Sequence, residues 1–257
     1  MESDPPPGGG PAARRGVLHA LGDLLFPAGP APGLTPGPGG AGNPHGVLPP
    51  LLIALTFVSG LVDAVSFLGL DHVFVANMTG NVAFLGFALA GYGELSASAS
   101  ALALTAFLAG ALIAGRLRRG ERPDGLGRLA GPLVAVQAVL VGAALATREG
   151  GGGQLAVIAL LALGMGLQNG VVHRLAVPDL TTTVVTRALA GLAVDRWGPA
   201  SVRRLVTVLT LLAGALAGGA LTLGHGPRPA LVLAVVLLLA VALAAARAAR
   251  PRPGPAT

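Results

Sequence analysis

Long apolar runs separated by short polar connections dominate the chain from Val47 to its C-terminal end. A run of about 20 apolar residues is long enough to cross the roughly 30 Å hydrocarbon core of a bilayer as a helix. The pattern predicts six such helices, over residues 47–70, 97–116, 128–147, 154–175, 204–224 and 229–248. The sequence therefore favours an all-α membrane protein with about six transmembrane helices.

Two further apolar stretches, His72 to Tyr92 and Leu180 to Val194, are interrupted by polar residues and a glycine. The interruptions are Asn77, Thr79, Gly80 and Asn81 in the first stretch and Thr181, Thr182, Thr183, Thr186 and Arg187 in the second. If both stretches crossed, giving eight spans, the Arg-rich connection 116–128 would lie outside, against the positive-inside tendency. If both are half or re-entrant helices, the arginines at 116–128, 196–204 and 247–252 all lie in the cytoplasm with the two termini. We therefore predict six crossings.

The ends of the chain differ in composition from the spans. Residues 1–45 are rich in Pro and Gly and cannot bury enough apolar surface to offset the entropy of ordering, so we expect a disordered tail. Residues 46–248 form the predicted polytopic transmembrane domain, and residues 249–257 form a short basic C-terminal tail. The lipid bilayer is the first expected partner.

Composition supports the membrane assignment and excludes several classes. Hydrophobic residues make up 53% and charged residues 11% of the chain, and the mean hydropathy is +0.74, whereas soluble domains carry about 25% charged residues. The net charge of +6 lies in connections without interleaved aromatic residues, so no nucleic-acid partner is expected. With no cysteine, disulfides and thiolate metal sites are excluded. We predict no metal and no cofactor.

The two halves of the domain, about 46–147 and 154–248, show similar features in the same order. The segment Gly60–Asp63 aligns with Gly166–Asn169, and Leu108–Leu112 is identical to Leu212–Leu216. The segment Met78–Asn81 aligns more loosely with residues 185–188. With three crossings in each half, the second half would be inverted relative to the first, an arrangement known from secondary transporters. An inverted repeat is therefore expected.

Two motifs carry a family resemblance. The stretch GLVDAVSFLGLDHVFVANMTGNVAFLGFALAG at 60–91 and the stretch MGLQNGVVHRLAVPDLTTTVVTRALAGLAVD at 165–195 resemble the YoaK-like family of bacterial membrane proteins, defined as a domain of unknown function. The similarity extends over about residues 47–248. The family pattern has Gly at the position that Arg187 occupies here. The resemblance implies a membrane protein but indicates no substrate and no activity.

Asp63 is the first candidate for chemistry, because it lies well inside a predicted span, where a charged carboxylate is costly unless it is paired or hydrated. It is either a proton or cation site or a protonated, hydrogen-bonded residue that fixes helix packing.

The polar residues of the interrupted stretches could cap half-helices. Two facing helix N-termini would favour an anionic or carbonyl-bearing ligand, and plain capping without a ligand is the alternative.

Gln168 and Asn169 occupy the place in the second half that corresponds to Asp63. Their uncharged amides suit either a binding site or hydrogen bonds between helices. Arg187 follows the Thr cluster by about one helical turn. We expect it either to neutralise Asp63 across the two halves or to extend toward the cytoplasm.

The function expected first is a small secondary transporter or permease for a small polar or anionic solute, with Asp63 binding a coupling proton. The alternatives are a membrane-embedded enzyme acting on a lipid-like substrate and a non-catalytic scaffold. No GxxxxGK[ST], HExxH or GxSxG motif occurs, so no catalytic residue is assigned and an enzyme is the less favoured class. The predicted substrate or ion site consists of Asp63, Asn77, Thr79, Gly80, Asn81, Gln168, Asn169, Thr182, Thr183, Thr186 and Arg187.

Overall fold

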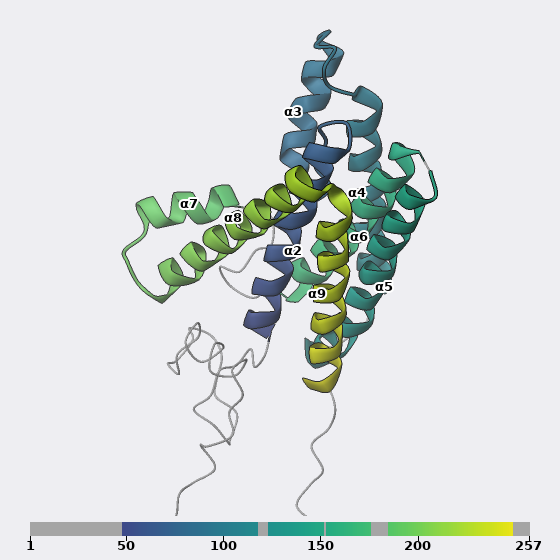
Figure 1. Cartoon of the computed structure of the whole chain (residues 1–257). Coiled ribbons are helices and arrows are strands. Elements are labelled where there is room, and N and C mark those ends of the chain that lie inside the picture. Colours follow the sequence, from purple (N-terminus) through teal and green to yellow (C-terminus); the bar gives the residue numbers. More distant parts are fainter. Residues whose placement is uncertain (1–47, 118–122, 152, 176–184, 249–257) are drawn as a thin grey trace, which may run out of the picture.

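A computed structural model of the chain describes residues 48–117, 123–151, 153–175 and 185–248 (Figure 1). The predictions for the N-terminal tail, for the C-terminal tail and for Thr182 and Thr183 lie outside the described residues. Within the described part every regular element is a helix.

Six helices in the described part are long and apolar enough to cross a membrane, which confirms the predicted all-α membrane fold. They are α2 (Leu48–Gly69), α4 (Ala97–Leu117), α5 (Pro123–Glu149), α6 (Gln154–Leu175), α8 (Pro199–His225) and α9 (Pro227–Ala248). The two interrupted stretches instead contain the short helices α3 (Met78–Leu89) and α7 (Val185–Val194). Both are too short to span a bilayer as straight helices.

Two long helices begin earlier than the hydropathy pattern indicated. Helix α5 starts at Pro123 rather than at 128, and α8 starts at Pro199 rather than at 204. Proline suits the first turn of a helix because its missing N–H has no intrahelical partner there. The added turns are polar, with Arg203 among their residues, so hydrophobicity alone could not include them.

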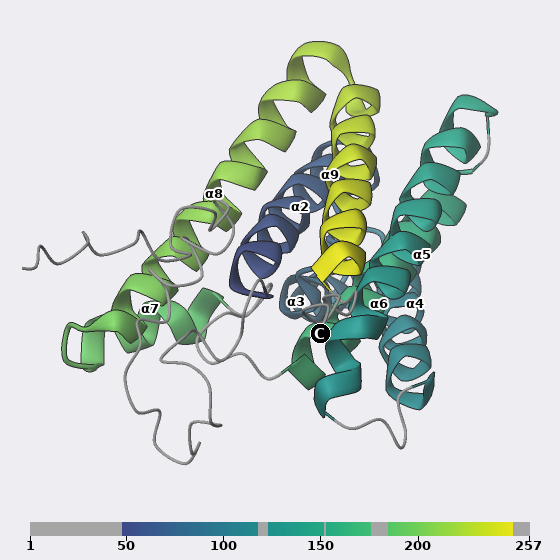
Figure 2. The same cartoon turned by 90° about the horizontal axis from the view of Figure 1, so that it is seen from below.

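Helices from one half of the chain pack mainly against helices from the other half. Helix α2 packs along α8, α4 packs along α6, and α5 packs against both α6 and α9. The short helices stay with their own halves, since α3 lies on α4 and α7 lies on α8 (Figures 1 and 2). Most of α2 and α6 is buried, so these two helices form the centre of the bundle.

Glycine allows the two main helix crossings to be very close. A Cβ atom built on any of four glycines would overlap the backbone of the partner helix. The contacts are Gly60 with Leu211 and Gly214 with Phe57 at the α2–α8 crossing, and Gly110 with Leu163 and Gly166 with Phe107 at the α4–α6 crossing. Small residues that let backbones approach are the usual means of helix association in membranes.

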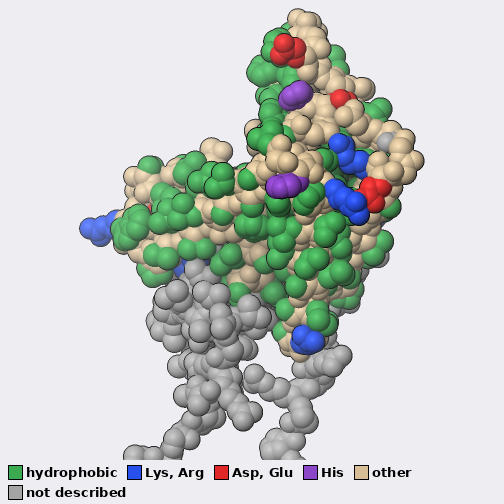
Figure 3. All heavy atoms as spheres, viewed as in Figure 1, with side chains coloured by type: hydrophobic (Ala, Val, Ile, Leu, Met, Phe, Trp, Pro, Cys, Tyr) green, Lys and Arg blue, Asp and Glu red, His purple; other side chains and the backbone are tan. Residues whose placement is uncertain are grey.

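Many large apolar side chains are exposed on the described surface. Figure 3 shows hydrophobic side chains spread over the face in view, with charged and histidine side chains in its upper half and further basic side chains at its left and lower ends. Large exposed apolar side chains include Leu108, Leu112, Val139, Leu216, Val236 and Leu239. A soluble monomer rarely exposes so continuous an apolar surface, whereas lipid tails would cover it.

Candidate functional site

The segment between α2 and α3 folds back along the helix that precedes it. After α2 ends at Gly69, the chain turns through Asp71 and His72, whose φ angles are +40° and +49°. These left-handed conformations are uncommon for residues other than glycine and mark a tight reversal. We call residues 70–77 the return segment. Its course brings Val75 back beside Asp63 of α2.

Asp63 is held by the backbone of the return segment. Its Oδ1 accepts hydrogen bonds from the N–H groups of Val75 at 2.9 Å and Ala76 at 2.7 Å. The N–H of Asn77 also interacts with this carboxyl group. A carboxylate that accepts backbone N–H bonds is stabilised without a basic partner. In the described part of the chain, no ion pair includes Asp63.

Asn81 fixes the same segment from the other side. Its Oδ1 accepts the Phe74 N–H at 2.9 Å, and its Nδ2 donates to the Phe74 carbonyl oxygen at 2.6 Å. Asn81 is fully buried. The side-chain amide thus acts on Phe74 as a neighbouring strand would, because it supplies one acceptor and one donor. The return segment is therefore clamped between Asp63 and Asn81.

Aromatic rings pack beside this clamp. Phe67 and Phe74 stack with ring centroids 5.1 Å apart, and Phe74 stacks on Phe84 at 5.5 Å. The imidazole of His72 meets Phe67 edge-on at 5.4 Å. Gly80 lies against the Phe74 ring, where a Cβ atom would clash with it. Gly80 is thus needed for packing in this cluster.

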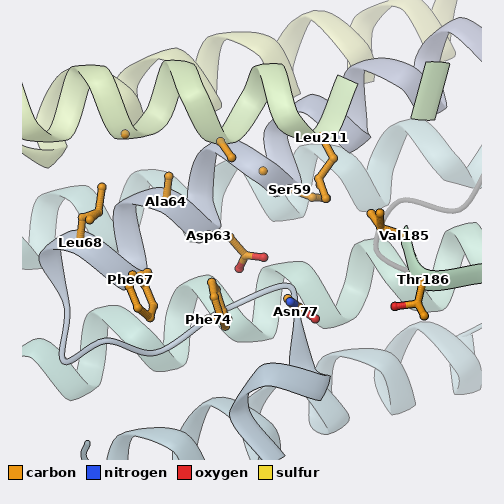
Figure 4. A pocket seen from close by; sticks show the side chains of 13 residues that line it. Ser59, Asp63, Ala64, Phe67, Leu68, Phe74, Asn77, Val185, Thr186 and Leu211 are labelled. Carbon is orange, nitrogen blue, oxygen red and sulfur yellow. The ribbon is translucent and has the colours of Figure 1, made fainter. Parts of the chain in front are cut away.

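A cavity of about 420 Å³ opens beside Asp63, between α2, the return segment, the first turn of α7, and α8 (Figure 4). Its polar lining residues are Ser59, Asp63, Asn77 and Thr186. The apolar part of the wall is formed by Gly60, Ala64, Phe67, Leu68, Phe74, Val185, Leu211, Ala215 and Gly219. Asp63 is the ionisable residue among these described lining residues. The pocket brings together a residue before α3 and the first two residues of α7.

Comparison with known proteins places the chain in a family. A family model described as a protein of unknown function (DUF1275) matches residues 51–244. The chain belongs to the DUF1275 family. It is also 33% identical over 151 residues to the UPF0700 transmembrane protein YoaK of Bacillus subtilis (strain 168). That alignment covers 56% of this chain and 65% of YoaK, slightly less than two thirds of the relative's length. No solved structure matches the chain.

These matches confirm the resemblance to the YoaK-like family that the two motifs indicated. Together with the six long apolar helices, they establish a multi-pass membrane protein of an uncharacterised family.

Gln168 is buried at the centre of a hydrogen-bond chain between helices. Its Oε1 accepts from Gln137 Nε2 of α5 at 2.8 Å, and its Nε2 donates to Ser59 Oγ of α2 at 2.9 Å. Ser59 Oγ in turn donates to the Leu55 carbonyl oxygen at 3.0 Å. Gln168 thus bonds α6 to α5 and α2, and it reaches the pocket only through Ser59.

The other predicted residues are dispersed. Asn77 occupies the N-cap position of α3, but its side chain makes no capping hydrogen bond, which corrects the expectation of a side-chain cap. Thr79 and Arg187 are exposed, and Arg187 forms no ion pair with Asp63. The Nδ2 of Asn169 donates to the Met165 carbonyl oxygen at 3.3 Å within α6. Of the described predicted residues, Asp63, Asn77 and Thr186 share the pocket.

Several features of the site were not predicted from the sequence. The main-chain donors Val75 and Ala76 carry no side-chain signal at all. Gln137 could have been noticed as a lone amide in an apolar span, and Ser59 as a hydroxyl one turn before Asp63. Among the described residues, no three His, Asp or Glu side chains gather closely enough to hold a metal ion.

Proposed function

We propose that this protein is a small secondary transporter whose solute site is the cavity beside Asp63. The cavity has room for a solute of several heavy atoms, and it lies where elements of both halves meet. Asp63 carries the coupling proton in this proposal. The observation that carries the proposal is a carboxyl group on a membrane-spanning helix that lines a cavity and is held by backbone N–H groups instead of a basic side chain.

The hydrogen bonds of Asp63 suit a group that gains and loses a proton. The bonds from the Val75 and Ala76 N–H groups both end on Oδ1, so the second carboxyl oxygen, with two lone pairs, keeps acceptor capacity beside the Asn77 N–H. Figure 4 places the carboxyl between α2 and the return segment, with Thr186 farther along the same opening. Intramembrane acids that line cavities commonly mark proton and ion pathways.

We further propose that the two halves form an inverted repeat. A shift of 106 residues carries Gly60 to Gly166 and Phe57 to Leu163, and a shift of 104 carries Gly110 to Gly214 and Phe107 to Leu211. Applied to the glycine contacts, these shifts exchange the α2–α8 crossing with the α4–α6 crossing. Transporters built this way alternate access by moving one group of helices against the other.

The proposed orientation has both termini in the cytoplasm. Six crossings place the two termini on the same side, and Arg116, Arg196 and Arg247 lie near the span ends that would face the cytoplasm. The supporting argument is the excess of arginine in cytoplasmic connections. Reaction of impermeant reagents with tags at the two termini would test this orientation.

Reconstitution tests the transport proposal. Purified protein in liposomes that contain a pH-sensitive dye is exposed to a panel of small solutes, after thermal-shift screening has selected those that stabilise it. We expect at least one solute to move protons, and Asp63→Asn to abolish that movement. Asp71→Asn is the matched control, because Asp71 is exposed at the turn after α2 and Asn tolerates a positive φ. Equal proton flux in the wild type and Asp63→Asn would refute the role of Asp63.

A further inference from the structure

The pocket beside Asp63 is suited to one sign of ligand charge. Among its described lining residues, no lysine, arginine, histidine or second acid faces Asp63 from α2, the return segment, α7 or α8. An ionised Asp63 would therefore give the cavity a net negative charge. A charge in a low-dielectric site attracts an opposite charge strongly and repels a like one.

The backbone donors that could hold an anion are already occupied. The N–H groups of Val75 and Ala76, which precede α3, donate to Asp63. An anionic solute would have to displace this carboxylate or lie beside it. Both arrangements are unfavourable, because like charges at close range destabilise each other. This geometry argues against the anionic solute that two facing helix N-termini had suggested.

Two aromatic rings complete the case for a cation. Phe67 and Phe74 line the same cavity and stack on each other beside Asp63 (Figure 4). The face of an aromatic ring attracts organic cations, and quaternary ammonium groups are often recognised by aromatic walls. A carboxylate and aromatic rings in one cavity provide both elements of such recognition.

We propose that the solute is a small organic monocation that exchanges with a proton at Asp63. This inference rests on the transport function proposed above and names its substrate class. When the cation binds, the Asp63 O–H bond breaks and the proton leaves to water, so that one positive charge replaces another. When the cation leaves, a proton from water returns to the carboxylate. The exchange is one for one and changes no net charge.

This stoichiometry follows from the cost of charge within a membrane. With either a proton or a monocation on Asp63, the pocket is neutral, whereas the empty pocket with an ionised Asp63 carries a charge. A charged group at bilayer depth is costly unless it is paired or hydrated. The protein can therefore switch the side to which the pocket opens more readily when the pocket holds a proton or a cation than when it is empty and charged. This difference couples the flow of the cation to the flow of protons.

A set of probes matched in shape but not in charge tests the inference. The full chain is reconstituted in liposomes with an internal pH dye, and a gradient of choline is imposed from outside. The neutral control is 3,3-dimethyl-1-butanol, which replaces the quaternary nitrogen by carbon, and the anionic control is 3,3-dimethylbutane-1-sulfonate. Tetramethylammonium and tetraethylammonium extend the range of cation sizes. We expect the cations to drive proton efflux and the two controls to drive none.

Variants assign the effect to the pocket. Asp63→Asn should abolish cation-driven proton efflux, and Asp71→Asn should leave it unchanged. Phe67→Leu should raise the half-saturating choline concentration by about 2- to 30-fold, the range expected for one lost cation–π contact. If Phe67 only supports folding, the variant would change the amount of active protein without changing this concentration. In detergent and weak buffer at low pH, choline should release close to one proton for each cation bound.

The outcomes separate the two proposals. Asp63-dependent proton flux driven by the sulfonate or by the neutral alcohol, but not by the cations, would overturn the cation inference and leave the transporter proposal standing. Cation-driven flux that is unchanged in Asp63→Asn would overturn the exchange at Asp63. The absence of proton movement with every member of the set and with the wider solute panel would overturn both.

Discussion

Replacing Asn81 by leucine should release the return segment from α3. In the folded protein the Asn81 amide satisfies both the N–H and the carbonyl oxygen of Phe74, at 2.9 and 2.6 Å. Leucine fills a similar space and can do neither. Each buried polar group left without a partner costs about 1–3 kcal/mol. Because Phe74 is only half buried, water can compensate in part. We therefore expect the free energy of local opening of the return segment to fall by about 2–4 kcal/mol.

Hydrogen exchange followed by mass spectrometry measures this loss locally. A local opening that becomes easier by about 2–4 kcal/mol speeds exchange by about 30- to 1,000-fold, since 1.4 kcal/mol corresponds to a factor of ten. The effect should appear at the amides of Val75 and Ala76, which donate to Asp63. It should be absent from the centre of α6, which lies outside the clamp.

The control is Thr79→Ala, two residues away on the exposed side of α3. A substitution at such a surface position usually changes stability by no more than about 0.5 kcal/mol. If Asn81→Leu exchanged at Val75 and Ala76 as slowly as the wild type, Asn81 would not be what holds the return segment. Equal acceleration in Thr79→Ala would also refute the reasoning, because it would indicate a general loosening of α3.

Three further predictions concern the bundle and its surface. Gly214→Ala should lower the free energy of unfolding by about 1–3 kcal/mol, because the added Cβ would overlap the α2 backbone. Gly142→Ala, which has open space around it, should instead raise the free energy of unfolding by about 0.5–1 kcal/mol. Gln168→Leu should cost about 1–3 kcal/mol for each buried partner left unpaired, measured by thermal unfolding in detergent. Glu94 raises the pKa of Tyr92 above the ordinary 10.0 by accepting its hydrogen bond and by its negative charge. Glu94→Gln should therefore lower the pKa of Tyr92, and ultraviolet titration of this single tyrosine would show no shift if the contact were absent.

The long helices could be predicted because their information is local. A run of apolar residues specifies a span wherever the rest of the chain lies, so α2, α4, α6 and α9 were predicted within about two residues of their bounds. The starts of α5 and α8 were missed because a polar first turn is stable as helix but does not resemble lipid-facing sequence. The two short helices, α3 and α7, were expected from the polar residues that interrupt their apolar stretches.

The site could be predicted only in part. Asp63 was recognisable as an acid inside an apolar run, and it does line the pocket. Its partners are main-chain N–H groups twelve and thirteen residues away, and they reach it only because the chain reverses at Asp71 and His72. A motif does not encode such contacts. The role of Asn81 was missed for the same reason, since capping is a local interaction whereas its bonds to Phe74 depend on the reversal.

Water access to the cavity is the most direct test of the account, because every proposed role of Asp63 requires it. The chain contains no cysteine, so a single introduced thiol can be followed without background. Ala215 lines the cavity on α8, and its neighbour Leu216 is 71% exposed on the apolar outer surface. Thiols react with hydrophilic reagents as thiolates, which form in water and are disfavoured in apolar surroundings. In liposomes, Ala215→Cys should react with a charged methanethiosulfonate reagent at least about tenfold faster than Leu216→Cys, and choline should slow it. Equal rates, or faster reaction at Leu216→Cys, would show that the space beside Asp63 is closed to water.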